Sequence, residues 1–527
     1  MKGLHRLQDR IYRIGLRSAQ LLTLLLTGGL TICSLFWGYY AEEMDTQASV
    51  AHNEPFFLHL LGALAMLLLL SLLLTFTRTY TVSKTTPILV AALCWIGFLG
   101  ILLIFSGRSI PTADSASVYG IAQALASGQM GVIHPTDSYL SYYPQQIGLV
   151  AFYEIIIRLW NLLPISYEAF HILQCINVGM ACAIVYVQYK TTRLLFCDKA
   201  AVSYLFLAVL NAPLIIYTSF VYGEIPSLAF FSTGIYLLLL YFEKKEQSFR
   251  RRLLYLICSL PMMMAAVAVR KNSLIVVIAA VIVLVWEWLR TQRHYLLFYA
   301  AVLVACCISV LPAIQRIYEH RADSTLSTGV PAISYVAMGT QESSRGNGWY
   351  NGFNFYTYEE SRLDTAVTTE KSKAAIKASL SAFRADPGYA FRFYADKFLS
   401  QWTDGSYFCR QATWTHGDGR WGIVNALYSG GLSLPFIHYC NIYQLLVYGS
   451  CLTCLINLWR RRKTEGSAPG LPSYICIIAV LGGFLFHMVW EANSRYILPY
   501  FLLLLPYAAH GLGIAHTTLS HRFPFSF

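Results

Sequence analysis

The stretch that decides the fold is residues 86–106, TPILVAALCWIGFLGILLIFS, followed by residues 107–115, GRSIPTADS. The first part is an uncharged run of about 20 residues, long enough to cross the hydrocarbon core of a bilayer as a helix. Asp114 lies a few residues beyond the point where this helix leaves the hydrocarbon. Because a carboxylate is costly beside this low-dielectric region, Asp114 is a candidate functional residue. The alternative is a solvated loop aspartate.

Composition extends this interpretation to the whole chain. Of 527 residues, 56% are hydrophobic and 13% are charged, whereas soluble proteins carry about 25% charged residues. Apolar runs of about 20 residues recur along nearly the entire length, which predicts an all-α polytopic membrane protein. The net charge of +12 is concentrated in short segments between these runs, as is typical of cytoplasmic loops. No basic stripe lies on a soluble domain, so no nucleic-acid partner is predicted.

The basic segments also set the predicted topology. Residues 145–163 are apolar enough to be a span, but counting them would place the basic segment 190–199 outside. Residues 143–163 are therefore predicted to form an interfacial or re-entrant helix on the outer side. The N-terminus is then inside, and about twelve transmembrane helices follow by length. They are predicted near 19–40, 56–77, 86–106, 168–189, 200–219, 224–242, 253–269, 272–289, 295–314, 434–459, 473–490 and 494–516.

A long segment between the ninth and tenth predicted spans exceeds the length of an ordinary loop. It has helix-like sequence at 371–384 and 389–402 and aromatic-rich polar sequence up to Trp421, which predicts a small mixed domain lying on the outer face. The predicted organisation is two N-terminal helices at 1–85, a transmembrane core at 86–314 with an outer loop at 107–167, an exterior loop domain at 315–433, and C-terminal transmembrane helices at 434–527.

Charged residues at the outer ends of the spans are the candidate site. Asp114 and Glu224 are acids at helix ends that emerge outward, and a helix N-terminus favours the carboxylate of Glu224, with simple capping as the alternative. Arg270, Lys271 and Arg495 lie at the same level. Arginine suits bidentate binding of a phosphate, although snorkelling to lipid headgroups is the alternative. Together these residues indicate a lipid-phosphate substrate and an acceptor that must lose a proton.

Five short motifs carry a resemblance to a known family. They are YYPQQIG at 142–148, YGEIP at 222–226, VRKNSL at 269–274, WTDGSYF at 402–408 and WEANSRY at 490–496. In their order, and with Asp114 in the first outer loop, they resemble GT-C membrane glycosyltransferases. More narrowly, the chain is similar to the protein-mannosyltransferase and aminoarabinose-transferase group of bacterial polyprenyl-phosphate-sugar enzymes. The resemblance covers roughly residues 86–516, and the first two spans precede the usual start of the family.

The sequence departs from that family at two places. It has a single acid in Ala113-Asp114-Ser115, where an acidic pair is common in the fold. This difference counts against dependence on a divalent metal. It has Tyr143-Pro144-Gln145 in place of the His-Pro-Pro type element of protein mannosyltransferases. This difference counts against a serine or threonine of a protein as the acceptor.

The resemblance implies transfer of one sugar, with inversion, from a polyprenyl-phosphate donor to a hydroxyl on a cell-envelope glycan, lipid or protein. The reaction would take place on the outer face of the bacterial cytoplasmic membrane. Asp114 would be the general base, and Arg495 with Arg270 or Lys271 would hold the donor phosphate. Glu224 would orient the acceptor or share a divalent metal with Asp114.

Further residues are expected to position the donor or the acceptor, or to serve as candidate metal ligands. The positioning residues are Tyr143, Pro144, Gln145, Tyr222, Trp402 and Asp404, and the additional candidate ligands are His134, His171 and His416.

Two other functions stay open from the residues alone. A flippase or transporter of a lipid-linked sugar would also need many spans and arginines within the membrane, but the two halves of the chain show no internal repeat. A polymerase or ligase of surface polysaccharide would share the same general pattern. The chain has no glycine-rich phosphate loop, which argues against direct use of a nucleotide sugar by a soluble domain.

Overall fold

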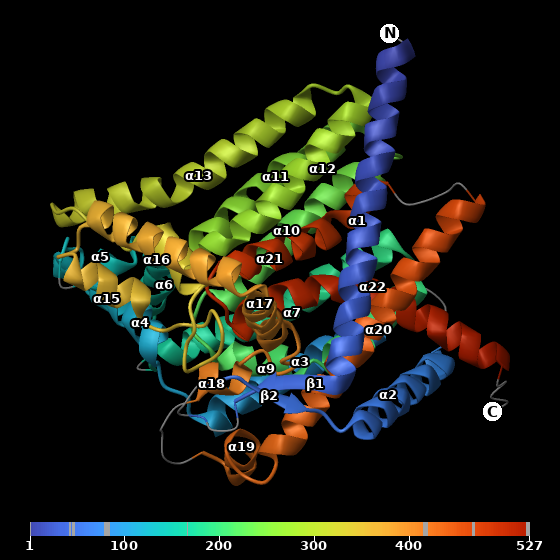
Figure 1. The fold of residues 1–527 in the computed structure, drawn as a ribbon, viewed down its shortest axis with the longest axis horizontal. Helices are drawn as coiled ribbons and strands as arrows, with labels where there is room; N and C mark the ends of the chain where they lie inside the picture. The colour runs from blue at the N-terminus through green and yellow to red at the C-terminus, as the bar shows by residue number, and fades with distance from the viewer. Residues whose placement is uncertain are drawn as a thin grey trace.

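The computed structural model describes residues 2–41, 44, 48–77, 85–136, 138–165, 167–414, 420–465 and 470–522. Eleven of the described helices are long and apolar enough to cross a membrane, and a bent pair adds a twelfth if it is counted as one span. The prediction of an all-α polytopic membrane protein is therefore confirmed (Figure 1). The eleven spans are formed by α1 (Lys2–Phe36), α2 (Phe56–Thr77), α3 (Thr85–Gly107), α7 (Ala169–Leu195), α10 (Glu224–Glu243), α11 (Phe249–Val269), α12 (Leu274–Thr291), α13 (Tyr295–Ala322), α20 (Ser433–Glu465), α21 (Ile475–Val489) and α22 (Leu498–Arg522). The spans of α12 and α21 include the 3-10 turns that precede these helices and begin at Lys271 and Leu471.

The bent pair corresponds to the straight span predicted at 200–219. It consists of α8 (Asp198–Val209) and a second arm, Ala212–Ser219, which begins with α9 (Ala212–Ile216), and the two arms meet at 61°. Asn211 caps α9 by accepting a hydrogen bond from the Leu214 backbone N–H at 3.1 Å, and Pro213 occupies the first turn. A proline is accepted in the first turn of a helix but not in its interior, so one helix ends here and another begins. The second arm leads into the turn before Glu224.

The start of α1 and its end differ from the predicted span at 19–40. The helix begins at Lys2 and ends at Phe36. The next residues form β1 (Trp37–Tyr40), which pairs antiparallel with β2 (Val50–Asn53). The sequence WGYY explains the change, because glycine weakens a helix and aromatic residues favour strands. The hairpin returns the chain to the start of α2.

Three short helices follow α3 and do not span the membrane by length. They are α4 (Ala113–Ala126), α5 (Tyr139–Tyr142) and α6 (Ile147–Asn161). A Cβ atom on Gly148 would overlap the backbone carbonyl oxygen of Ala268, so glycine is required where α6 crosses the end of α11. The helix predicted at 143–163 is present as α6, and its placement in or along the membrane stays a prediction.

We call residues 323–432 the cap. The helices predicted at 371–384 and 389–402 are confirmed as α16 and α17. Irregular segments join the helices in the described part of the cap, and one isolated bridge links Trp349 with Ala492. The cap lies beside α5 and α6 in Figure 1, and the Val330 N–H donates to the Tyr142 carbonyl at 2.9 Å. Its helices are α14 (Ala332–Met338), α15 (Phe353–Glu360), α16 (Thr365–Ala385), α17 (Pro387–Trp402), α18 (Cys409–Thr413) and α19 (Gly422–Tyr428).

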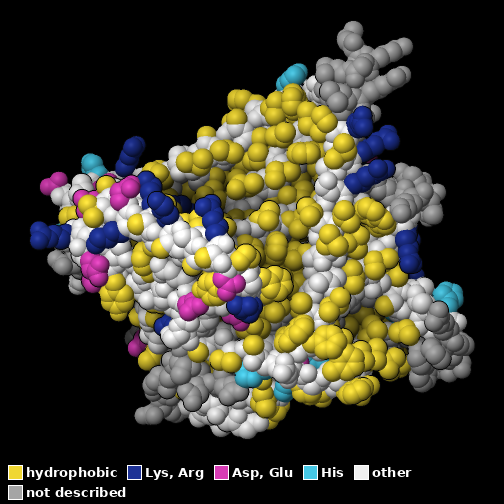
Figure 2. All heavy atoms as spheres, viewed as in Figure 1, with side chains coloured by type: hydrophobic (Ala, Val, Ile, Leu, Met, Phe, Trp, Pro, Cys, Tyr) yellow, Lys and Arg dark blue, Asp and Glu magenta, His cyan; other side chains and the backbone are white. Residues whose placement is uncertain are grey.

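A single cluster of buried hydrophobic residues extends from Leu16 in α1 to Leu512 in α22. Figure 2 shows hydrophobic side chains over the faces of the long helices, charged side chains over the cap on the left, and further Lys and Arg side chains along the right-hand side. This separation of apolar and charged surface is what a membrane-embedded helical body with a polar cap requires. The domain boundaries inferred from the sequence stay predictions.

Candidate functional site

The turn between α9 and α10 is the base of the site. Its backbone carbonyls point toward side chains of three helices, α4, α6 and α7, and each accepts a hydrogen bond from one of them. Because four successive carbonyls are held in this way, the conformation of the turn is fixed. The bonds are Gln174 Nε2 to Ser219 (2.8 Å), Asn177 Nδ2 to Phe220 (2.9 Å), Ser115 Oγ to Val221 (2.8 Å) and Tyr153 Oη to Tyr222 (3.1 Å).

Glu224 pairs with two arginines that come from separate turns. Its Oε1 atom forms an ion pair with Arg270 Nη1 and lies 3.3 Å from Arg495 Nε. The Glu224 side chain is only 2% exposed, and those of Arg270 and Arg495 are 14% and 15% exposed. Three predicted site residues therefore meet in one cluster. Two guanidinium groups share one carboxylate, so the cluster carries one surplus positive charge away from bulk water.

The arginines stay charged in this setting. Burial lowers the pKa of Arg270, but the Glu224 carboxylate outweighs burial and the pKa lies above its ordinary value. For Arg495 burial again lowers the pKa, and Glu224 with the neighbouring tyrosines raises it well above the usual value. The Arg495 guanidinium also lies 5.6 Å from the ring centroids of Phe220 and Tyr222. Such cation–π contacts hold an arginine without neutralising it.

Asp404 positions the turn that carries Arg495. It is 3% exposed, and its Oδ2 accepts a hydrogen bond from Ser494 Oγ at 2.6 Å and from the Phe408 N–H at 3.0 Å. Its Oδ1 accepts from the Ser406 N–H at 2.9 Å. The carboxylate thus joins the loop after α17 to the residue before Arg495. Trp402, also predicted, is buried and stacks on Tyr500 with centroids 6.4 Å apart, outside the ion-pair cluster.

Asp114 is the second residue of α4 and is exposed. It forms no ion pair with any residue that the structure describes. Its charge acts on the same space as the arginines, since burial, followed by the negative charge of Asp114, raises the pKa of Tyr222. Burial and the charges of Tyr350 and Asp114 similarly raise the pKa of Tyr143. Asp114 is therefore close enough to Tyr143 and to Tyr222, in the turn before Glu224, to act on both electrostatically.

The predicted segment Tyr143-Pro144-Gln145 forms a 3-10 turn before α6. Its contact with the site is made by the next residue, because Gln146 Nε2 donates to Tyr222 Oη at 2.6 Å. Tyr143 packs against Tyr139 with ring centroids 5.0 Å apart. The segment is thus joined to the Glu224 turn, although through Gln146 rather than through Gln145.

Lys271 does not join the cluster. It lies in a 3-10 turn immediately after Arg270, is exposed, and forms no ion pair with a described residue. Of the two basic neighbours, the arginine is the one that contacts Glu224.

Two ionisable residues near the site, Glu491 and Lys397, were not predicted as site residues from the sequence. Burial raises the pKa of Glu491 to about 7, and burial lowers the pKa of Lys397 to about 7. Lys397 Nζ donates to the Trp490 carbonyl at 2.8 Å and to the Gly339 carbonyl, which fixes the cap on the turn before Arg495. Glu491 could have been found, because it is an acid between two spans like Asp114. Lys397 lies on a polar cap helix and gives no such signal.

The candidate metal ligands are dispersed. Glu224 is paired with arginines, and no group of three described His, Cys, Asp or Glu residues includes Asp114 or Glu224. His134 Nδ1 contacts the Thr136 carbonyl at 2.9 Å, and His171 Nδ1 contacts Gln174 at 3.0 Å. His416 lies outside the described residues.

Comparisons with known proteins returned solved structures only, since no known protein family and no curated protein matches the chain. The apo oligosaccharyltransferase of Archaeoglobus fulgidus matches 84% of this chain and 52% of its own, with 13% identity and a TM-score of 0.47. The same archaeal enzyme, AglB, in complex with an inhibitory peptide and a dolichol-phosphate matches 82% of this chain and 51% of its own, with 14% identity and a TM-score of 0.43.

A third solved structure is ArnT from Cupriavidus metallidurans bound to undecaprenyl phosphate, which matches 85% of this chain and 81% of its own, with 11% identity and a TM-score of 0.33. This chain spans about half the length of the archaeal chains that it matches.

Proposed function

We propose that this chain is a membrane glycosyltransferase that moves a single sugar from a polyprenyl-phosphate donor to a hydroxyl acceptor. The observation that carries the proposal is the sharing of the buried Glu224 by Arg270 and Arg495, with the exposed Asp114 next to Ser115, which is hydrogen-bonded to the turn before Glu224. The surplus positive charge suits a phosphate anion at the membrane boundary. An unpaired carboxylate beside it suits removal of a proton from an incoming hydroxyl.

The arginines form the donor side of the site. When the bond between the anomeric carbon and the phosphate oxygen breaks, negative charge grows on the departing lipid phosphate. Arg495 and Arg270 are held before the reaction by Glu224, and Arg495 is held also through Ser494 and Asp404. Charges that are oriented in advance stabilise a developing anion without reorganisation at the moment of reaction.

Asp114 forms the acceptor side. It takes the proton of the attacking hydroxyl while the oxygen of that hydroxyl bonds to the anomeric carbon, which inverts the configuration at that carbon. General-base assistance of this kind contributes about 10²–10⁴-fold to a rate. Glu224 acts as a positioning residue for the arginines, because its carboxylate oxygen is already in contact with both of them.

Charge distribution supports a site on the outer face of a bacterial cytoplasmic membrane. Glu224 begins α10, whereas the basic residues around 244–252 follow the other end of that helix. Arg270 likewise lies at one end of α12 and Arg290 lies at the other. Since Lys and Arg clusters mark the cytoplasmic ends of spans, the cluster of Glu224, Arg270 and Arg495 faces outward, toward a cell-envelope glycan, lipid or protein acceptor.

The test uses the full chain in proteoliposomes with a polyprenyl-phosphate sugar labelled in the sugar, and with a cell-envelope extract as the source of acceptor. The proposal expects label to leave the lipid and to appear as one sugar per acceptor molecule. Arg495→Ala should abolish this transfer, and Arg392→Ala, on the exposed face of α17, should not. Label that crosses the bilayer while still attached to lipid indicates a flippase, and a ladder of products indicates a polymerase; either result contradicts the proposal.

A further inference from the structure

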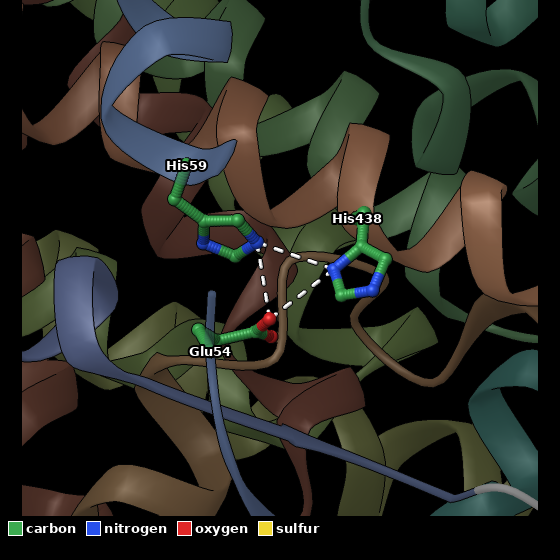
Figure 3. Close-up of side chains that lie close together, drawn as sticks. All are labelled: Glu54, His59 and His438. Carbon is green, nitrogen blue, oxygen red and sulfur yellow. Dashed lines mark hydrogen bonds and ion pairs between the residues drawn. The ribbon is translucent and has the colours of Figure 1, made fainter. Parts of the chain in front are cut away.

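Three side chains from separate elements converge at the junction between the N-terminal helices and α20. Glu54 follows β2, His59 lies in the first turns of α2, and His438 lies near the start of α20 (Figure 3). Glu54 Oε2 is 3.0 Å from His59 Nε2 and 3.2 Å from His438 Nδ1. The two ring nitrogens are themselves 3.2 Å apart. The three atoms therefore form a nearly equilateral triangle.

Hydrogen bonding alone does not account for this triangle. Each ring nitrogen presents either one proton or one lone pair, in a single direction. In Figure 3 both nitrogens point toward the same carboxylate oxygen and toward each other. A proton placed between one pair of these three atoms leaves another pair without a proton between them or with poor hydrogen-bond alignment. Three donor atoms that converge on a common centre are the arrangement of a metal site.

The dimensions fit zinc. Zinc binds histidine nitrogen and carboxylate oxygen at about 2.0–2.1 Å in a tetrahedron, so neighbouring ligand atoms are about 3.3 Å apart. The observed separations are 3.0, 3.2 and 3.2 Å. Two imidazoles and one carboxylate are also a donor set that zinc accepts in proteins. The triangle thus supplies three corners of a tetrahedron without movement of the backbone.

The surroundings hold the carboxylate in the orientation that a metal needs. His59 is fully buried, Glu54 is 6% exposed, and the second oxygen of Glu54 accepts a hydrogen bond from Asn441 Nδ2 at 2.6 Å. That bond leaves Oε2 directed at the two histidines. Hydrogen bonds of this kind, one step removed from the metal, orient metal ligands in known sites.

We propose that Glu54, His59 and His438 bind a zinc ion whose fourth position opens toward the groove between α2 and α20. His438 lines that groove, which has a volume of about 470 Å³ and is otherwise mostly apolar. A water molecule occupies the fourth position. The inference does not rest on the function proposed above, because none of the three ligands belongs to the cluster of Glu224, Arg270 and Arg495.

The zinc site ties the N-terminal helices to the rest of the protein. Glu54 comes from the segment between β2 and α2, His59 comes from α2, and His438 comes from α20. Asn441 extends the connection, since its Oδ1 accepts a hydrogen bond from the Gly405 N–H at 2.9 Å, next to Asp404. Loss of the metal is therefore expected to loosen the packing of α2 against α20 first.

The experiment uses the full chain purified in detergent without a polyhistidine tag, stripped with a chelator, and titrated with Zn²⁺ or Co²⁺. The proposal expects about one equivalent of bound metal, with the intense visible absorption of four-coordinate Co²⁺. His59→Ala and Glu54→Gln should each abolish binding. His320→Ala replaces an exposed histidine near the end of α13 and should bind as the wild type does. Asn441→Ala should weaken metal binding by about 10–100-fold.

Two results overturn the proposal. One is a wild-type protein that holds well under a tenth of an equivalent of either metal. The other is His59→Ala or Glu54→Gln binding metal as tightly as the wild type. Where a variant does not elute as a folded species, the thermal unfolding of the wild type decides: Zn²⁺ should raise its Tm, and an unchanged Tm contradicts the site.

Discussion

Ser115 donates a hydrogen bond of 2.8 Å to the backbone carbonyl of Val221, which lies 106 positions later in the chain. The bond is buried and joins the first turn of α4 to the turn that precedes Glu224. Asp114, the proposed base, is therefore fixed relative to the proposed phosphate site by the residue next to it. Asp114 and the cluster of Glu224, Arg270 and Arg495 come from different segments of the chain, and this contact joins those segments.

Replacement of Ser115 tests that connection. Ser115→Ala removes the hydroxyl donor and should cost about 1 kcal/mol of stability. It should also lower the rate of sugar transfer more than it weakens donor binding, because the base and the phosphate site would no longer be fixed together. The comparison is Ser381→Ala, on the exposed side of α16. Equal transfer rates in the two variants would show that the bond does not position Asp114.

Arg495→Lys keeps the positive charge but loses the planar guanidinium. A lysine cannot bind a phosphate in a bidentate manner or stack in the same way on Phe220 and Tyr222. We expect weaker binding of the donor and slower cleavage, with Arg495→Ala worse in both respects. Equilibrium binding of a polyprenyl monophosphate and single-turnover cleavage measure the two effects. A Lys variant as active as the wild type would remove the argument for a specific arginine contact.

Glu224→Gln should lower the thermal stability of the protein in addition to any effect on sugar transfer. It leaves two buried guanidinium groups without their carboxylate, and disruption of a buried ion pair costs about 3–5 kcal/mol. We expect a lower Tm than for Glu370→Gln, which removes an exposed acid on α16. A Tm equal to that of the Glu370 variant would mean that the ion-pair cluster does not hold the turn.

Glu491 predicts a pH dependence of stability. Burial raises its pKa from 4.5 to about 7, so the folded protein retains a proton that the unfolded chain releases. The resulting stabilisation is fully present below the ordinary pKa and is lost as the pH rises through about 7. Thermal unfolding between pH 5 and about 8 should show a falling Tm in the wild type and a flatter profile in Glu491→Gln. Parallel Tm profiles of the wild type and Glu491→Gln would exclude Glu491 as the source of the pH dependence.

The sequence predicted the spans and singled out Glu224, Arg270 and Arg495 as candidate residues because both leave one-dimensional signals, but it did not predict that Glu224 pairs with the two arginines. Apolar length marks a span, and a charge between two spans marks its end. The positive-inside rule then placed Glu224, Arg270 and Arg495 on one side before any contact was known. The break at Asn211 and Pro213 was also readable as a helix start, but length alone favoured one straight span.

Other features could not be predicted because they depend on tertiary packing. Lys397 gains its role only where α17 meets the turn at Trp490. Gln146 rather than Gln145 reaches Tyr222, a distinction set by the rotation of a short 3-10 turn. His59 and His438 are 379 positions apart, and nothing in the sequence pairs them. The hairpin of β1 and β2, which ends the first helix at Phe36, is what brings Glu54 to both of them.

The most direct test of the account is single-turnover cleavage of a radiolabelled polyprenyl-phosphate sugar by Asp114→Asn in the presence of acceptor. The variant keeps the size of the side chain, and the arginines, paired with Glu224, should still bind the donor. The account predicts donor binding like that of the wild type with cleavage slower by about 10²–10⁴-fold, while Glu370→Gln cleaves normally. Cleavage by Asp114→Asn at the wild-type rate would contradict it.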